Sequence, residues 1–241
     1  MSMPAATEIF LQQAVRGALA SKTSLNITAG NSKAFLGRVA CGQDLCINEH
    51  RGIIHYQPTE LVITARAGTL LSEIEQTLAE QGQMLAFEPP YFADTATLGG
   101  AVACGLSGAR RPFAGSVRDF VLGCKIINGK AEVLSFGGEV MKNVAGYDVS
   151  RLMAGAMGSL GILLEISLKV LPKPPIEQTV CFELSPSEAI NKMAQLSAQC
   201  LPVSGLSHDG RRLYVRLSGP ETAVRASAKK IGGELLAETA F

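Results

Sequence analysis

The sequence predicts an α+β protein with a larger N-terminal part and a smaller C-terminal part. Segments with helical and with strand periodicity are mixed over residues 1–174. The clearest strand is followed by prolines at 172, 174 and 175, a pattern typical of a domain boundary. Beyond it, residues 175–241 follow a strand, helix, strand, strand, helix, strand order. We therefore expect two domains, residues 1–174 and residues 175–241.

The N-terminal part begins with a helix, because apolar residues recur at helical spacing over 11–19. Residues 25–28 look like a short strand that runs into a loop, and residues 52–56 and 61–67 are typical of two further strands. A second helix is expected to begin with Thr69 as its cap, since a threonine hydroxyl can accept an orphan backbone N–H one turn on.

Gly82 is expected to end that helix. Residues 88–115 then form a long stretch rich in Gly, Pro and Ala, with a short helix expected at 98–103, and long loops of this kind are usually functional. A hairpin with Asn-Gly at its tip is predicted over 120–136. Residues 164–170 alternate apolar and polar side chains, which predicts a strand with one face on the core and one toward solvent.

The C-terminal part fits a partial ferredoxin-like module. Ser185 and Glu188 form a capping box, and Pro186 and Pro220 occupy first-turn positions where a missing N–H has no cost. The expected elements are strands 177–183, 203–206, 213–217 and 234–236, and helices 186–199 and 220–231.

Composition excludes several classes of protein. Hydrophobic residues make up 47% and charged residues 18% of the 241 residues, so a packed core is expected rather than disorder. The formal net charge is +1, and adjacent basic pairs are too few and scattered for a nucleic-acid partner. We interpret one such pair, Arg110-Arg111, as solvated surface arginines.

Cysteine spacing and the N-terminus favour a cytoplasmic protein. The six cysteines show no CxxC spacing, so we expect mostly buried free thiols and no zinc or iron–sulfur site in this chain. Residues 1–10 do not resemble a signal peptide, and no apolar run approaches the roughly 18 residues of a transmembrane segment. His50 and His55 have no metal-spaced partner and are interpreted as surface or turn histidines.

Three glycine-rich segments could carry chemistry. In residues 29–38, consecutive backbone N–H groups could wrap a pyrophosphate as an anion nest, although a plain turn is an alternative. In residues 96–108, paired glycines could let the backbone approach a ligand and a short helix aim its N-terminus at phosphate. The alternative there is a tightly packed helix with a small-residue face. In residues 143–148 and 155–162, a backbone edge could hydrogen-bond an adenine.

These segments match no other nucleotide fingerprint. A Rossmann site needs GxGxxG between the first strand and helix, followed by an acidic residue about 20 positions later, and the chain has no such unit. It also has no GxxxxGK[ST], which argues against a P-loop nucleotidase.

In this order and spacing, the segments resemble the FAD-binding domain of the p-cresol methylhydroxylase (PCMH) and vanillyl-alcohol oxidase superfamily. Residues 31–38, 58–62, 115–123 and 136–151 in particular look like the family of FAD-binding E subunits of bacterial glycolate oxidases. The resemblance implies a PCMH-type domain of two α/β subdomains followed by a cap. It also implies FAD contacts, which carry over to Ala29, Gly30, Asn31, Ser32, Lys33, Leu98, Gly99, Gly100, Ala103, Gly105, Val121, Gly155, Ser159, Gly161 and Ile162.

The resemblance further implies non-covalent FAD, because the first loop offers Ser32 where covalent relatives carry a histidine or cysteine. The implied function is oxidation of glycolate, a small 2-hydroxy acid, to glyoxylate within a complex. The implied partners are a catalytic FAD subunit and an iron–sulfur subunit, and through them the complex could lie at the periphery of the inner membrane. Valine at Gly99 or Gly100 is expected to abolish flavin retention.

The chain also departs from catalytic relatives. Met157 stands where they carry an acidic residue, and His208 is the sole histidine of the cap, so no catalytic residue and no metal ligand is assigned. One alternative is a flavin-fold scaffold that assists assembly with little or no catalysis of its own. A second is a reductase that uses a nicotinamide donor, for which the cap offers no evident acid or base.

Overall fold

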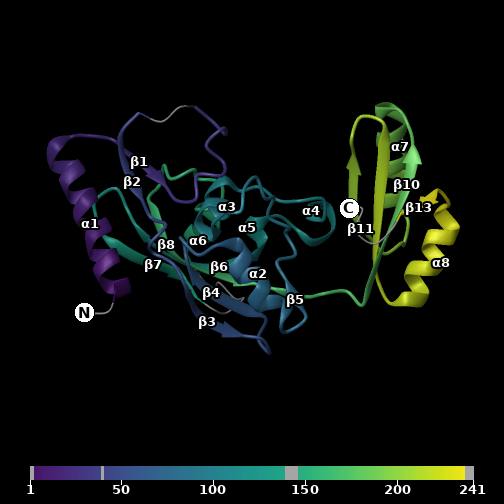
Figure 1. The fold of residues 1–241 in the computed structure, drawn as a ribbon, viewed down its shortest axis with the longest axis horizontal. Coiled ribbons are helices and arrows are strands. Elements are labelled where there is room, and N and C mark those ends of the chain that lie inside the picture. Colours follow the sequence, from purple (N-terminus) through teal and green to yellow (C-terminus); the bar gives the residue numbers. More distant parts are fainter. Residues whose placement is uncertain (1–2, 39–40, 139–145, 237–241) are drawn as a thin grey trace. The chain divides into compact units, whose positions relative to one another are not determined.

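The computed structural model describes residues 3–38, 41–138 and 146–236, and it confirms the α+β class. Residues 139–145, which include part of the third glycine segment, lie outside the described residues. The chain forms two compact units (Figure 1), each described here by itself. Unit 1 consists of Met1–Leu85, Pro89–Leu106 and Ser116–Leu171, and unit 2 of Ala86–Glu88, Ser107–Gly115 and Pro172–Phe241.

Unit 1 is built on a five-stranded antiparallel sheet of order β3-β4-β8-β6-β7. The strands are β3 (Ile53–Gln57), β4 (Val62–Arg66), β6 (Val121–Ile127), β7 (Val133–Gly137) and β8 (Ile162–Lys169), with the short β9 (Leu171–Pro172) following β8. The expected core face of β8 is confirmed, and its expected solvent face holds only in part, since Glu165 and Lys169 are half-buried and Ser167 is buried. Ser167 is buried because its hydroxyl pairs with that of Thr64 on β4 at 2.9 Å.

Two longer helices accompany this sheet. Helix α1 (Met3–Ser21) is joined to the β6–β7 hairpin, where Lys125 Nζ lies 2.7 Å from a Glu8 carboxylate oxygen. Helix α2 (Leu71–Ala79) begins after Leu70, so the expected cap at Thr69 is wrong. The Thr69 hydroxyl accepts instead from the backbone N–H of Gly52, and it therefore fixes the entry to β3 rather than the start of the helix.

Shorter elements complete unit 1. Strand β1 (Leu25–Thr28) pairs in parallel with β2 (Gln43–Cys46), a strand that the sequence pattern did not predict. The remaining elements are β5 (Gln83–Met84), α3 (Leu98–Cys104), α5 (Val117–Phe120) and α6 (Val149–Leu152). Fully buried apolar side chains from α1, α2, α3 and the central strands form the core, and they include Leu11, Ile63, Ile74, Leu98, Leu164 and Ile166.

Unit 2 contains the predicted strand and helix order. Its strands β10 (Ile176–Glu183), β11 (Val203–His208), β12 (Arg212–Gly219) and β13 (Glu234–Leu235) form an antiparallel sheet of order β11-β12-β10-β13. Helices α7 (Pro186–Ser197) and α8 (Glu221–Ile231) supply apolar residues to its core, and α4 (Arg111–Ala114) comes from an earlier part of the chain. The capping box of Ser185 and Glu188 is confirmed, whereas Pro220 lies at the N-cap of α8, one residue before the first turn.

An ion cluster joins the three chain segments of unit 2. Arg110 is ion-paired with Glu88 and Glu177, and Arg216 with Glu88. The two arginine side chains are 9% and 10% exposed, so the interpretation of Arg110 as a solvated surface residue is wrong, while Arg111 is exposed as expected. Burial opposes ionisation of Glu177, but hydrogen bonds from Ser218 and Arg110 outweigh it and lower the pKa of that carboxyl.

Two further expectations are corrected. Only Cys124 and Cys181 are buried, and Cys41, Cys46 and Cys200 are exposed, so the thiols are not mostly buried. His50 is not a surface residue, because it is 1% exposed in unit 1, whereas His55 is exposed. None of the described helices combines the length and apolarity that crossing a membrane would require.

Candidate functional site

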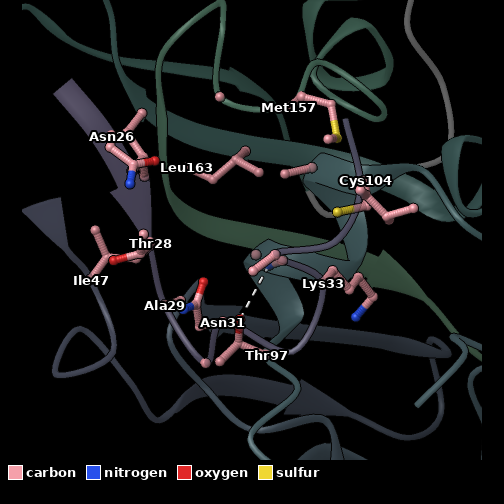
Figure 2. A pocket seen from close by; sticks show the side chains of 18 of the residues that line it. Asn26, Thr28, Ala29, Asn31, Lys33, Ile47, Thr97, Cys104, Met157 and Leu163 are labelled. Carbon is pink, nitrogen blue, oxygen red and sulfur yellow. Dashed lines mark hydrogen bonds between the residues drawn. The ribbon is translucent and has the colours of Figure 1, made fainter. Parts of the chain in front are cut away.

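A cavity of about 730 Å³ lies in unit 1 at the place where the glycine-rich segments meet. Its wall is formed by β1 and the loop after it, by α3, and by the segment that leads into β8 (Figure 2). In this view Asn26, Thr28 and Ile47 lie on one side, and Lys33, Cys104 and Met157 lie on the other. The volume lies within the range of about 300–1,000 Å³ usual for ligand and cofactor sites.

The loop after β1 presents a row of free backbone donors. Among the described residues, the N–H groups of Gly30, Asn31, Ser32 and Lys33 make no hydrogen bond. Asn31 has a left-handed φ of 56°, and a residue in that conformation turns neighbouring N–H groups toward a common point. A bound anion with several oxygens, such as a pyrophosphate, would satisfy these donors. The interpretation of residues 29–38 as an anion nest is therefore favoured over a plain turn.

Close packing holds this loop in place. Gly30 lies against Thr95, and a Cβ at Gly30 would come within 1.5 Å of the Thr95 carbonyl oxygen. The Thr95 hydroxyl also donates to the carbonyl oxygen of Gly30. Only glycine fits this approach, so the position of the nest depends on the absence of a side chain at residue 30.

The N-terminus of α3 is occupied by other contacts. The N–H of Leu98 donates to the Thr69 carbonyl and that of Gly99 to the Ala67 carbonyl, at 2.9 and 2.8 Å. The N–H of Gly100 donates to the Thr97 hydroxyl at 3.2 Å, shown by the dashed line in Figure 2. The expectation that this helix aims free N–H groups at phosphate is therefore wrong.

Gly99 has a packing role. A Cβ at this position would lie 2.7 Å from the Ala67 Cβ and 2.9 Å from the Ala67 carbonyl oxygen. Valine at Gly99 would therefore collide with the end of β4 before it reached a ligand. A Cβ at Gly100 would meet only the Thr97 hydroxyl, at 3.1 Å, so the expected block of a ligand remains a prediction for Gly100. The small-residue face of α3 is thus used for packing at Gly99.

The third segment closes the cavity by docking on the C-terminal end of α3. The N–H groups of Gly155 and Met157 donate to the carbonyls of Val102 and Ala103, at 3.0 and 2.9 Å. A Cβ on Gly105 would lie 2.9 Å from the Gly155 Cα, so the two glycines allow this contact. Met157 has φ of 52° and is 51% exposed at the cavity wall.

The structure brings together most of the residues predicted to contact FAD. Those that line the cavity are Ala29, Gly30, Asn31, Ser32, Lys33, Gly99, Gly100, Ala103 and Gly161. The others lie in the core, in β6 or β8, or in neighbouring turns; they are Leu98, Gly105, Val121, Gly155, Ser159 and Ile162. Gly105 and Gly155 therefore shape the wall through their mutual contact rather than by lining it.

Several lining residues were missed by the sequence analysis. Asp44 and Ile47 reach the cavity through β2, and Asp44 accepts a hydrogen bond from the Asn26 amide at 2.7 Å. Thr97, Cys104 and Met157 also line it. A parallel pairing of two four-residue strands leaves no local periodic signal, so nothing in the sequence marks Asp44 as a neighbour of Asn26.

Two titratable side chains of the cavity wall, Lys33 and Cys104, have shifted pKa values. Burial lowers the pKa of the Lys33 amine, and an interaction with Cys104 opposes part of that effect. Burial raises the pKa of the Cys104 thiol, which keeps it protonated and a poor nucleophile near neutral pH. Lys33 belongs to the loop of the anion nest, residues 29–38, which we call the nest loop, and Cys104 belongs to α3.

A cavity wall of free N–H groups, small residues and apolar side chains fits a dinucleotide-type cofactor. The FAD-binding domain family matches residues 5–137, and the chain belongs to this family. The predicted FAD-binding domain is therefore confirmed, and FAD is the cofactor of this family. A solved structure of alkyldihydroxyacetonephosphate synthase has a TM-score of 0.70 over 92% of this chain and 47% of that chain. Its sequence identity is 16%, so that likeness concerns the fold alone.

Curated proteins show which kinds of FAD-binding protein the chain is similar to. The chain is 54% identical over 227 residues to glycolate oxidase subunit GlcE of Escherichia coli (strain K12), which covers 94% of this chain and 65% of that protein. It is 31% identical to D-lactate dehydrogenase of Anaerostipes hadrus, over 65% of this chain and 33% of that protein. It is 29% identical to glycolate oxidase subunit GlcD of Bacillus subtilis (strain 168), over 74% of this chain and 38% of that protein. The chain thus spans less than two thirds of each of these relatives.

Proposed function

We propose that this chain is the FAD-binding part of a multi-subunit enzyme that oxidises glycolate, or a closely similar 2-hydroxy acid, to the 2-oxo acid. The free N–H groups of the Gly30–Lys33 nest, beside a cavity of about 730 Å³, are the observation that carries the FAD assignment. The substrate class rests on the similarity to glycolate oxidase subunits and D-lactate dehydrogenase. FAD supplies a two-electron acceptor for the hydroxy acid, and the protein supplies position and electrostatics.

The residues of the cavity would divide the work of holding FAD. The nest would bind the pyrophosphate, while Gly99, Gly100 and Ala103 on α3 and Gly161 before β8 would line its path. Binding is expected to be non-covalent, because the nest loop carries Ser32 and no histidine or cysteine. Cys104 does line the cavity, but its raised pKa disfavours the thiolate that a covalent bond to flavin would need.

We further propose that turnover needs partner subunits. The proposed partners are a second, catalytic FAD subunit and an iron–sulfur subunit that removes electrons, and the complex would work in the cytoplasm or at the periphery of the inner membrane. Support comes from relatives that are themselves named as subunits, GlcE and GlcD. No residue of the described cavity is assigned as the acid or base of the reaction.

A single sample tests this proposal. The purified chain is scanned for flavin absorbance before and after acid precipitation, and is then titrated anaerobically with dithionite and separately with glycolate. Flavin that acid releases, and that dithionite reduces but glycolate does not, supports a non-covalent FAD subunit dependent on a partner. Bleaching by glycolate alone would place the active site in this chain. A colourless protein that takes up no added FAD would contradict the FAD assignment.

A scaffold role in assembly is the second candidate. It is favoured by the occupied N–H groups of Leu98, Gly99 and Gly100, since a nest without help from α3 holds an anion with fewer donors. Reconstitution of the complex distinguishes the two. A Gly30→Ala variant that assembles normally but lowers flavin content and turnover together supports the FAD role, whereas unchanged turnover supports the scaffold.

A further inference from the structure

The nest loop buries the side chain of Lys33, whose amine has no hydrogen-bond partner among the described residues. Lys33 is 9% exposed in the cavity wall, and its Nζ atom makes no hydrogen bond within the described residues. Removing an amine from water without a compensating contact is costly. A lysine with its amine in water, or an apolar side chain in place of Lys33, would not carry that cost. The burial of the Lys33 amine therefore requires a functional explanation.

In the part of the chain that the structure describes, no carboxylate is recorded as a partner of the Lys33 amine. Its Nζ lies 5.8 Å from the centroid of the Phe92 ring, and that ring makes an edge contact with Phe35. From α3, the titratable group that faces it is the Cys104 thiol, whose raised pKa keeps it uncharged near neutral pH. An aromatic face attracts a cation only weakly compared with an oxyanion. Burial therefore lowers the pKa of the Lys33 amine, and no neighbouring oxyanion among the described residues opposes that effect.

The anion site lies on the same loop. The backbone N–H of Lys33 is itself one of the free donors of the nest, so an anion held there would lie beside the backbone of Lys33. A lysine amine is carried on a flexible four-carbon stem with three rotatable donors. Rotation of this side chain away from Phe92 would therefore bring Nζ to a phosphate oxygen without movement of the loop.

We propose that Lys33 is the counter-ion of the cofactor's pyrophosphate, and that a proton from solvent adds to its amine when the pyrophosphate enters the cavity. This inference rests on the proposed binding of FAD. Burial lowers the pKa of the Lys33 amine in the free protein, and the negative charge of a bound pyrophosphate would raise it. Binding of FAD then takes up a proton wherever the pH lies above the pKa of the free protein and below that of the complex, and within that window affinity falls as pH rises.

Isothermal titration calorimetry measures this uptake directly. FAD is titrated into the purified full chain in two buffers of different ionisation enthalpy, at about pH 7 and about pH 9, because lysine normally titrates near pH 10.4. We expect more proton uptake at the higher pH. ADP-ribose, which has the pyrophosphate but no flavin, should give the same uptake, whereas riboflavin, which has no phosphate, should give none.

Substitutions assign the proton to Lys33. Lys33→Met should lose the uptake, weaken FAD binding about 10-fold to 100-fold at pH 7, and raise the apo-protein's melting temperature because a buried unpaired amine is removed. Lys33→Arg should keep most of the affinity without uptake, since arginine stays protonated. Cys104→Ser should keep the uptake. Lys130→Met, on the exposed hairpin turn, is the matched control and should behave as the wild type.

The outcomes separate this inference from the proposed function. Wild-type protein that binds FAD without proton uptake, or Lys33→Met protein that retains the uptake, would overturn the role of Lys33 and leave the FAD assignment standing. Uptake with FAD but none with ADP-ribose would show that the proton is taken up near the flavin, and it would overturn the pyrophosphate assignment. Wild-type protein that binds no FAD would refute both.

Discussion

At the scale of single residues, Gly30 and Gly99 are both glycines of the cavity wall but are required for different reasons. Gly30 sets the nest against Thr95, whereas Gly99 sets α3 against Ala67. Gly30→Ala should lower FAD affinity at least 10-fold, because the loop must move to relieve a 1.5 Å contact with the Thr95 carbonyl oxygen. Fluorescence titration with FAD measures this effect.

Gly17→Ala is the matched control for that prediction, since a Cβ at Gly17 meets nothing within 4 Å. It should leave FAD affinity unchanged and stabilise α1 by about 0.5–1 kcal/mol. Gly99→Ala should instead lower the free energy of unfolding by about 1–3 kcal/mol through overpacking. Equal FAD affinity of Gly30→Ala and wild type would show that the nest does not hold the cofactor.

His50 predicts a pH-dependent stability. Both ring nitrogens are buried and have no hydrogen-bond partner among the described residues, and burial, followed by the charge of Arg66, lowers the pKa of His50. Because the folded-state pKa is the lower one, the unfolded chain binds more protons as pH falls below about 6.5. The free energy of unfolding should therefore decline in that range, by at most about 1.4 kcal/mol per pH unit for this group.

Urea unfolding of His50→Leu between about pH 5 and 8 tests this sign. The variant should show a flatter dependence below about pH 6.5 than the wild type. His55→Gln, at an exposed position, is the control and should keep the wild-type slope. A His50→Leu slope equal to that of the wild type would assign the dependence to other groups.

At the scale of elements, α3 connects the fold to the site. Its N-cap hydroxyl, on Thr97, holds the N–H of Gly100 at the cavity wall. Thr97→Ala should cost about 1 kcal/mol of stability and also weaken FAD binding, because Gly100 is no longer held. Ser185→Ala removes a comparable cap from α7 in unit 2, so it should cost similar stability without a change in FAD affinity. Loss of affinity in both variants would indicate a global effect.

The elements also show how far sequence reasoning extends. The five longer helices, α1, α2, α3, α7 and α8, and most strands were predicted, because their periodicity, caps and turn residues are local signals. The four-residue helices α4, α5 and α6 were not, since a single turn has no periodicity to detect. Strand β2 was not, since its four residues include a single buried position, and its pairing with β1 is set by tertiary contact. The nest could be anticipated from Gly30, Asn31 and Ser32. The occupied N–H groups of Leu98 and Gly99 could not, because their acceptors, Thr69 and Ala67, lie about 30 residues earlier in the chain.

At the scale of the whole molecule, the chain enters unit 2 three times, which a boundary placed at the prolines does not anticipate. The segments Ala86–Glu88 and Ser107–Gly115 precede the predicted cap in sequence, yet they belong to its unit. Their ion pairs explain why. Glu88 is paired with Arg216, and Arg110 with Glu177, both partners coming from the sheet of unit 2. Buried arginines such as Arg110 and Arg216 need partners of opposite charge.

Arg110→Met should therefore destabilise unit 2 by on the order of 3 kcal/mol, because Glu88 and Glu177 lose a buried partner. Arg211→Met, which removes an exposed pair with Glu183, should cost less than about 1 kcal/mol. Amide hydrogen exchange locates the effect: β11 and β12 should exchange faster in Arg110→Met, while β4 and β8 keep wild-type protection. FAD affinity should also stay unchanged, since the cavity is lined by unit 1 alone. Equal loss of protection in both sheets would show that the two units unfold cooperatively, and that the ion cluster stabilises unit 1 as well as unit 2.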